Sequence, residues 1–292
     1  MRGPERVGWR RDGAEGRFLR KILGIKGRMI TQNTAAKKIK STNPWLVFLM
    51  PGKDSLHQNW KEDYRQYGFD LCILQYDVNH EFTDENSKNA TYLIKRPGKR
   101  FKLISYFMKD HPEVLDKYEH FFILDDDIDT DPIQINKLLT TCKRYHFDLA
   151  QPGLAEGSYI AHPPTARDPN TRFRLSPSVE CMVPVFSQRA FRATQDDIHL
   201  LPCGIGWGME VAWELNFHAG EGRSIWGGRI GMIDDVYFKH TRIQQYGTGT
   251  GVYSNGGRDG AWGDLNTLKQ KYGSRWKELD LSTRVYIQKK QK

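Results

Sequence analysis

Long hydrophobic runs are missing from this sequence of 292 residues. No stretch approaches the roughly 20 apolar residues that a membrane-spanning helix needs. The most apolar segment near the start, FLRKILGIKGRMI, is interrupted by charges throughout. It therefore lacks the continuous apolar stretch of a secretory signal. We expect no transmembrane segment and a cytoplasmic location.

Closely spaced cysteines are also absent. The sequence has four cysteines, at positions 72, 142, 181 and 203, and no two of them form the CxxC pair that is typical of zinc sites. Cys72 and Cys142 stand in apolar or helical patterns, so we expect them to be reduced residues of the core. The sequence has no internal repeats either.

Acidic residues are scarce only at the start of the chain. Residues 1–40 hold 12 Lys and Arg but 3 Asp and Glu, whereas the remaining residues hold 32 of each sign. We therefore expect a basic, flexible tail over residues 1–43 and a neutral body over residues 44–292. A neutral body argues against a nucleic-acid partner, and the tail suits at most weak contact with an anionic membrane surface.

Apolar segments alternate with helical patterns in the first half of the body. Strands are predicted at residues 45–50, 69–77 and 121–124, and helices after residue 54, at 101–108 and at 132–145. This alternation predicts an α/β fold with a Rossmann-type, mostly parallel central sheet flanked by helices. Residues 44–150 would form a nucleotide-binding half.

The second half, residues 151–292, is rich in Gly- and Pro-containing loops. Strands are predicted at residues 179–186 and 229–238, and helices at 188–194, from residue 209 and at 262–272. No linker divides the body, so we expect one domain whose second half faces an acceptor.

The segment FFILDDDIDTDP, residues 121–132, carries the strongest chemical signal. Its apolar run reads as a strand buried on both faces. Asp125, Asp126 and Asp127 follow at the carboxyl end, where open α/β sheets bind ligands. Three adjacent carboxylates repel one another, and Mn²⁺ or Mg²⁺ compensates them well because hard cations prefer carboxylate oxygen. An ordinary solvated loop or helix cap is the alternative.

Two basic segments suit a diphosphate. PGKDSLHQNW follows the first strand and offers Lys53 to the nucleotide and His57 to the substrate. KRPGKRFK holds five basic residues in eight, among them Lys102. Each segment on its own also fits a solvated surface turn.

Two later segments carry further candidates. In GWGMEVAW, Glu210 falls in the first turn of a helix and suits a general base, and Trp207 can stack on a sugar ring. A Glu at a helix start is also common for electrostatic reasons alone. In GMIDDVYFKHTR, His240 stands just past a strand and is a good manganese ligand, and Arg242 can pair with phosphate.

The order of these segments resembles that of a GT-A-fold glycosyltransferase. More closely, the chain is similar to the glycosyltransferase-like family called domain of unknown function 707. The resemblance covers roughly residues 45–241, and its segments are DSLHQNW, FFILDDDI, AQPGLAEGSYIAHP, SVECMVPVF, GWGMEVAW and IDDVYFKHTR.

The resemblance implies a hexosyl- or pentosyltransferase that uses a nucleotide-diphosphate sugar, a hydroxyl acceptor such as a glycan, and Mn²⁺ or Mg²⁺. It implies that Asp125 contacts the ribose or base side of the nucleotide and that Asp126 assists. Asp127, Asp125 and His240 would bind the metal. Glu210 would take the catalytic position, giving inversion, although Asp is the commoner residue there.

Two other classes compete with this interpretation. A haloacid-dehalogenase phosphatase also has DxD after an apolar strand, but the Thr or Val expected four positions later is Asp129 or Asp131 here. A non-catalytic glycan or nucleotide binder could use Trp207, Trp213 and Trp226 for stacking alone.

Overall fold

The computed structural model describes residues 42–242, 257–276 and the short strand at 286–287. The tail predicted over residues 1–43 lies almost wholly outside these ranges, so its character stays a prediction. Asn43, at the start of the described body, donates a side-chain hydrogen bond to the carbonyl of Phe69 (3.1 Å).

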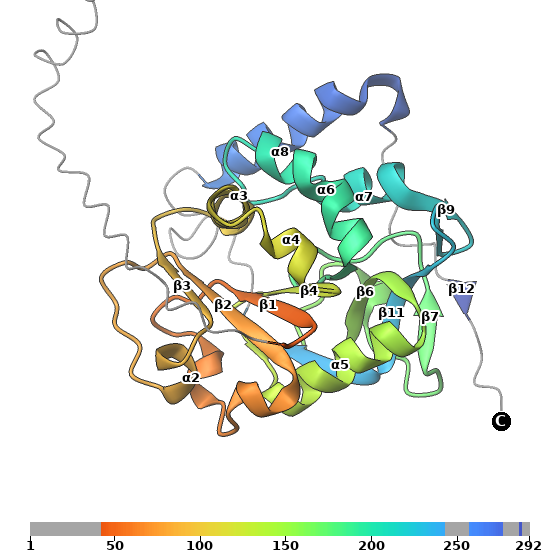
Figure 1. Ribbon diagram of the computed structural model, residues 1–292. Coiled ribbons are helices and arrows are strands. Elements are labelled where there is room, and N and C mark those ends of the chain that lie inside the picture. The colour runs from red at the N-terminus through yellow and green to blue at the C-terminus, as the bar shows by residue number, and fades with distance from the viewer. Residues whose placement is uncertain (1–41, 243–256, 277–285, 288–292) are drawn as a thin grey trace, which may run out of the picture. The chain divides into compact units, whose positions relative to one another are not determined.

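A single mixed sheet forms the centre of the described body (Figure 1). Its main strands are β1 (Trp45–Leu49), β2 (Phe69–Gln75), β3 (Tyr92–Lys95), β4 (His120–Leu124), β6 (Phe147–Leu154), β7 (Phe173–Leu175), β8 (Val185–Ser187), β11 (Arg229–His240) and β12 (Tyr286–Ile287). Their order is β12-β7-β11-β6-β8-β4-β1-β2-β3. Strands β3, β2, β1 and β4 are parallel, and so are β6 and β11, whereas β8 runs antiparallel between β4 and β6.

Helices cover both faces of the sheet. In Figure 1, α3 (Arg100–Asp110), α4 (Val114–Lys117), α6 (Gln188–Leu200), α7 (Met209–Phe217) and α8 (Gly257–Tyr272) lie on one side, and α2 (Glu85–Lys88) and α5 (Pro132–Arg144) on the other. Three short strands complete the fold: β5 (Ile128–Asp129), β9 (His218–Gly220) and β10 (Arg223–Ser224).

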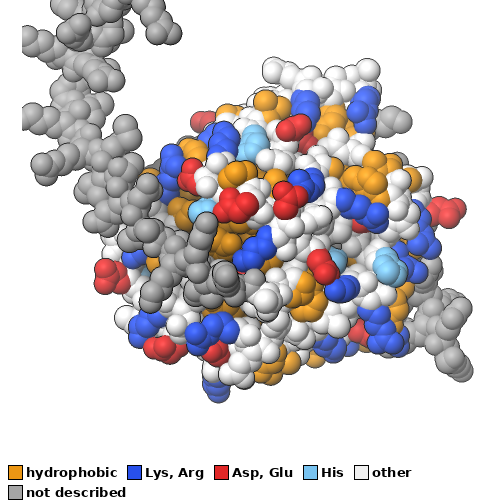
Figure 2. Space-filling view, viewed as in Figure 1, with side chains coloured by type: hydrophobic (Ala, Val, Ile, Leu, Met, Phe, Trp, Pro, Cys, Tyr) orange, Lys and Arg blue, Asp and Glu red, His pale blue; other side chains and the backbone are white. Residues whose placement is uncertain are grey.

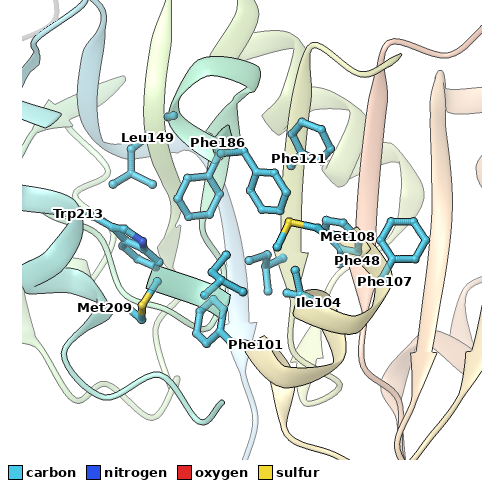
Figure 3. Close-up of a cluster of buried hydrophobic side chains, with 14 of the residues drawn as sticks. Phe48, Phe101, Ile104, Phe107, Met108, Phe121, Leu149, Phe186, Met209 and Trp213 are labelled. Carbon is cyan, nitrogen blue, oxygen red and sulfur yellow. The ribbon is translucent and has the colours of Figure 1, made fainter. Parts of the chain in front are cut away.

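Two hydrophobic clusters hold the sheet between these helix layers. Alternate residues of β1 enter different clusters: Phe48 packs under α3 and α6, and Val47 packs on the α5 side. Figure 3 shows Phe48 among the aromatic side chains of the first cluster, including Phe121 and Phe186. Burial on both faces explains why β1 is apolar throughout rather than alternating between apolar and polar residues.

The surface carries both signs of charge. On the face shown in Figure 2, Lys and Arg side chains are intermixed with Asp and Glu. This distribution agrees with the neutral body expected from the sequence. All four cysteines are free thiols, and Cys72 and Cys142 are buried as expected.

The predicted α/β fold with a mostly parallel central sheet and flanking helices is confirmed. Several elements differ from the prediction. The helix after residue 54 is only a short 3₁₀ helix at Leu56–Asn59, the strand predicted at 179–186 is formed only from Val185, and β3 and β7 were not predicted. Strand β6 was not predicted at all. Among the residues that the structure describes, no helix is both long and apolar enough to cross a bilayer.

Candidate active site at the end of strand β4

The carboxyl end of β4 brings the two halves of the chain together. Residues 125–127 follow Leu124, and β5 then pairs antiparallel with the end of β11, so that Ile128 lies opposite His240. Thr241 fixes this register, because its backbone N–H and its hydroxyl both donate to the carbonyl of Asp127 (3.0 and 2.9 Å). Backbone pairing therefore places His240 beside the acidic segment.

Asp127 and His240 form the centre of the site. The Nε2 of His240 lies 3.4 Å from Oδ2 of Asp127. Its Nδ1 lies 2.7 Å from the carbonyl of Tyr159, which can only accept, so Nδ1 carries a proton. Burial acts to lower the pKa of His240, but the hydrogen bond and charge of Asp127 outweigh it and raise that pKa. When the ring is neutral, Nε2 therefore turns its lone pair toward the carboxylate. When the ring is protonated, Nε2 shares its proton with the carboxylate.

The residues present fit a divalent cation with two protein ligands. Oδ1 of Asp127 is buried and has no hydrogen-bond partner among the described residues. Together with Nε2 of His240 it offers one carboxylate and one imidazole ligand, a set that suits manganese. No group of three His, Cys, Asp or Glu residues in the described ranges is arranged to hold a metal. Substrate or water oxygens would have to complete the coordination.

Asp125, the third predicted metal ligand, has another partner. The guanidinium of Arg100, at the start of α3, donates to its Oδ2. Arg100 also donates to the carbonyl of Cys181 (2.7 Å). Burial raises the pKa of Asp125 to about 7, although Arg100 opposes the shift; Asp127 and Asp126 add to it. The structure therefore places Asp125 in an ion pair with Arg100, next to Asp127 and His240.

Asp126 fastens the loop after β1 to the site. Its Oδ2 accepts from the backbone N–H of Gly52 (2.8 Å) and the hydroxyl of Tyr76 (3.1 Å). A Cβ at Gly52 would lie 2.1 Å from the Tyr76 hydroxyl, so any other residue there would displace the Tyr76 side chain. Burial is the main cause that raises the pKa of Asp126. Lys53 is exposed on the same loop, at the rim of the site.

Arg242 lies on the other side of Asp126, with Nη1 3.3 Å from its Oδ1. A second donor of the guanidinium reaches the carbonyl of Asp54. The side chain keeps 40% of its surface exposed, so it can still meet an incoming phosphate.

Two predicted residues lie elsewhere. His57 is buried, and its two ring nitrogens hydrogen-bond to the hydroxyls of Ser55 (2.6 Å) and Ser87 (2.9 Å). Burial lowers its pKa to about 4, against the opposing charge of Asp84. This geometry argues for a structural role and against the predicted substrate contact.

Lys102 does not point to the acidic cluster. Its ammonium lies 3.3 Å from the carbonyl of Leu201, at the end of α6. Arg100, two residues earlier in the same basic segment, is the residue that reaches Asp125. One residue of the predicted basic segment therefore reaches the acidic cluster, but the sequence did not indicate which of its members turns inward.

Glu210 lies in the first turn of α7, as predicted. Gly208 precedes the helix with a φ of 91°, a conformation that favours glycine. Oε1 of Glu210 accepts from the backbone N–H of Cys181 (3.3 Å), whose carbonyl accepts from Arg100. Glu210 is thus connected through a single residue to the ion pair of Asp125.

Trp207 packs edge-to-face against Trp262 of α8, with ring centroids 5.4 Å apart and an interplanar angle of 76°. Trp262 keeps 45% of its surface exposed. Trp213, in contrast, is fully buried and donates to Thr194, so it is part of the core. Trp226 stacks on Phe217.

A carboxylate on α8 fixes the turn that precedes Glu210. Asp264 is fully buried and accepts from the backbone N–H groups of Cys203 (2.9 Å), Gly204 (3.2 Å) and Gly206 (3.0 Å). The sequence offered no signal for this residue, because one Asp in a polar helix is indistinguishable from a solvated one.

Glu180 is a second acid that the sequence did not indicate. Only 7% of its surface is exposed, and its Oε2 has no hydrogen-bond partner within the described part of the chain. Burial raises its pKa to about 7, and the charge of Glu210 adds to this shift. Its place within the motif SVECMVPVF was the only available hint.

Comparison with known proteins gives one family and several solved structures. The sequence model of the family described as protein of unknown function (DUF707) matches residues 25–283, and thus extends into the predicted tail. No curated protein matches the sequence.

The similar solved structures include S. aureus TarS 1–349 in complex with UDP-GlcNAc, with 9% identity, a TM-score of 0.45, and 78% of this chain and 72% of that chain covered. They also include GalNAc-T7 with UDP, GalNAc and Mn²⁺, with 11% identity, a TM-score of 0.49, and 77% and 48% covered. These values are too low to extend either protein's ligands to this chain.

Proposed function

The chain belongs to the DUF707 family, whose function is unknown, and we propose that it is a metal-dependent glycosyltransferase acting on a nucleotide-diphosphate sugar and a hydroxyl acceptor. The observation that carries this proposal is the pairing of Asp127 with His240 at the carboxyl end of a parallel strand. Ligands of open α/β sheets bind at this edge.

The residues around the pair would divide the reaction between them. Asp127 and His240 would hold the cation, which would supply positive charge to the departing diphosphate. Lys53 and Arg242 lie at the rim, where their charges can meet the same phosphates. Asp126 ties the Gly52 loop to the site and so shapes the nucleotide-binding side.

Glu210 is proposed as the general base on the acceptor side. It removes the proton of the acceptor hydroxyl while that oxygen bonds to the anomeric carbon and the diphosphate leaves with the electrons of the old bond. A single base and direct displacement imply inversion at the anomeric carbon. Trp207 stands three residues before Glu210 and would stack on a sugar ring.

Release of nucleoside diphosphate tests the proposed activity. The full-length protein is incubated with UDP-, GDP-, ADP- and CDP-hexoses, with manganese or with EDTA, and with a panel of oligosaccharide acceptors. We expect manganese-dependent release of a nucleoside diphosphate and a product whose anomeric configuration, read by NMR, is inverted. Release of inorganic phosphate instead indicates a phosphatase, and binding without any release indicates a non-catalytic binder.

A further inference from the structure

Glu180 occupies a segment that runs along the edge of the site. Two residues beyond it, the carbonyl of Met182 accepts from the backbone N–H of Asp125 (3.2 Å). The backbone N–H of Glu180 itself donates to Oε1 of Gln151 (2.6 Å), a fully buried residue of β6. The position of Glu180 is therefore fixed from both the acidic cluster and the sheet.

The carboxyl group of Glu180 is only partly satisfied by the described residues, because its one side-chain hydrogen bond there is with Thr165. Its Oε2 is buried and finds no partner in the described ranges. Asp234, a buried carboxylate away from the site, is fully engaged: it binds Arg174 twice, Thr171 and the backbone N–H of Asp168. A buried carboxylate with a purely structural role is expected to be fully hydrogen-bonded, as Asp234 is, because an unpaired buried polar group lowers stability.

Glu180 lies near residues that the proposed function assigns to the diphosphate and to the acceptor. The next residue, Cys181, donates its backbone N–H to Oε1 of Glu210 (3.3 Å) and accepts from Arg100 at its carbonyl (2.7 Å). In agreement with this position, the charges of Glu210 and His240 both act on the pKa of Glu180. In the proposed reaction, the diphosphate lies at His240 and the acceptor hydroxyl lies at Glu210. The sugar to be transferred must lie between the diphosphate and the acceptor, because its anomeric carbon is bonded first to the diphosphate and afterwards to the acceptor oxygen.

We propose that Glu180 contacts the transferred sugar, donating a hydrogen bond from its carboxyl group to a sugar hydroxyl. This inference rests on the proposed function, since it takes the diphosphate and acceptor positions from it. Burial and the charge of Glu210 raise the pKa of Glu180 to about 7, so that the protonated form is present at neutral pH. A protonated carboxyl is both a donor and an acceptor, which matches the hydrogen-bonding capacity of a hydroxyl group.

Two variants separate this role from others. Glu180→Met removes hydrogen bonding while keeping a side chain of similar length, and Glu180→Gln keeps a neutral donor and acceptor but cannot ionise. Glu113→Gln, at an exposed position before α4, is the control. Calorimetry with manganese measures dissociation constants for UDP, GDP, ADP and CDP and for their glucose, galactose and mannose conjugates, and the best-bound pair is used for all variants.

The readout is the ratio between the dissociation constants of the hexose conjugate and of the free diphosphate. We expect Glu180→Met to raise this ratio about 10-fold or more, the loss typical of one buried hydrogen bond. Glu180→Gln and Glu113→Gln should leave it within about 2-fold.

An unchanged ratio in Glu180→Met overturns the proposal. So does an equal loss in Glu180→Gln, because the ionised form would then be the one that matters. If the unaltered protein binds none of these diphosphates with manganese, the proposed function itself fails, and this result is distinct from a failure at Glu180.

Discussion

Nε2 of His240 lies 3.4 Å from Oδ2 of Asp127, although the two residues come from opposite halves of the chain. The pairing of β5 with the end of β11 creates this proximity through the backbone, before any side chain contributes. The sequence-based hypothesis that Asp127 and His240 bind the same cation required these two residues to lie close together. Had β11 ended on the other side of the sheet, the acidic segment would have had no imidazole partner.

Replacing Asp127 should remove the response to the metal without unfolding the protein. Asp127→Asn takes away a charged ligand, so we expect manganese-dependent nucleotide binding to weaken about 10- to 100-fold or more. Stability without metal should hold or rise, because one of three adjacent carboxylates becomes neutral. Calorimetry and thermal melting measure the two effects.

Asp129→Asn is the matched control, since Asp129 is exposed two residues further along. Equal metal dependence in Asp127→Asn and the unaltered protein would contradict the site. His240→Ala should reproduce the loss seen with Asp127→Asn.

Replacing Arg100 should destabilise the protein through Asp125. Arg100→Met leaves that carboxylate without its cation, and we expect a loss of about 2–3 kcal/mol in the free energy of unfolding. This value is below the range for a fully buried pair, because both side chains keep some solvent contact. Urea denaturation measures it.

The double variant Arg100→Met/Asp125→Asn should recover much of the loss, because the uncompensated charge is then gone. Lys95→Met, in the same basic segment but exposed, should change stability by less than about 0.5 kcal/mol. A loss that Asp125→Asn does not relieve would mean that Arg100 acts through Cys181 instead.

Replacing Asp264 should loosen the turn before α7. Asp264→Asn weakens three hydrogen bonds to backbone N–H groups, because an amide has one acceptor oxygen and no charge. We expect a loss of about 2 kcal/mol in the free energy of unfolding. Trp207 follows this turn, so acceptor binding should suffer more than nucleotide binding.

Asp259→Asn on the same helix is the control, because Asp259 is exposed. Parallel losses of nucleotide and acceptor affinity in Asp264→Asn would show a general effect on the fold rather than a local one.

The sequence predicted the fold wherever burial leaves a simple pattern. Strands β1, β2 and β4 are apolar on both faces and were found. Strand β6 was missed because Asp148, Gln151 and Pro152 interrupt its apolar residues. Asp148 is buried with Ser187, Ser224 and Arg189 as partners, which no local pattern reveals.

The sequence indicated candidate residues where their chemistry is concentrated in a short segment, as in residues 125–127, or where one residue type is distinctive, as in His240. The structure brings Asp127 and His240 together, and their roles stay predictions. Roles that depend on where a side chain points could not be predicted from the sequence. Arg100 and Lys102 stand two residues apart, yet only the first turns to Asp125. His57 is polar in sequence, but burial and two serine partners make it structural.

The pH dependence of stability provides a test of Glu180 that needs no substrate. The pKa of Glu180 is about 7 in the folded protein, against an ordinary value of 4.5, and burial is the main cause. Between these values the folded state holds a proton that the unfolded state has released. The folded protein is therefore favoured at low pH, and this contribution is lost as pH rises from 4.5 to 7.

Glu180→Gln cannot titrate, so its stability relative to the unaltered protein should depend on pH. The difference in the free energy of unfolding should grow in favour of the variant by up to about 3 kcal/mol between pH 4.5 and pH 7.5. Glu113→Gln should show no such trend, because its side chain is exposed. A difference that stays constant across this range, measured by urea denaturation, would mean that Glu180 is ionised in the folded protein and cannot donate the proposed hydrogen bond.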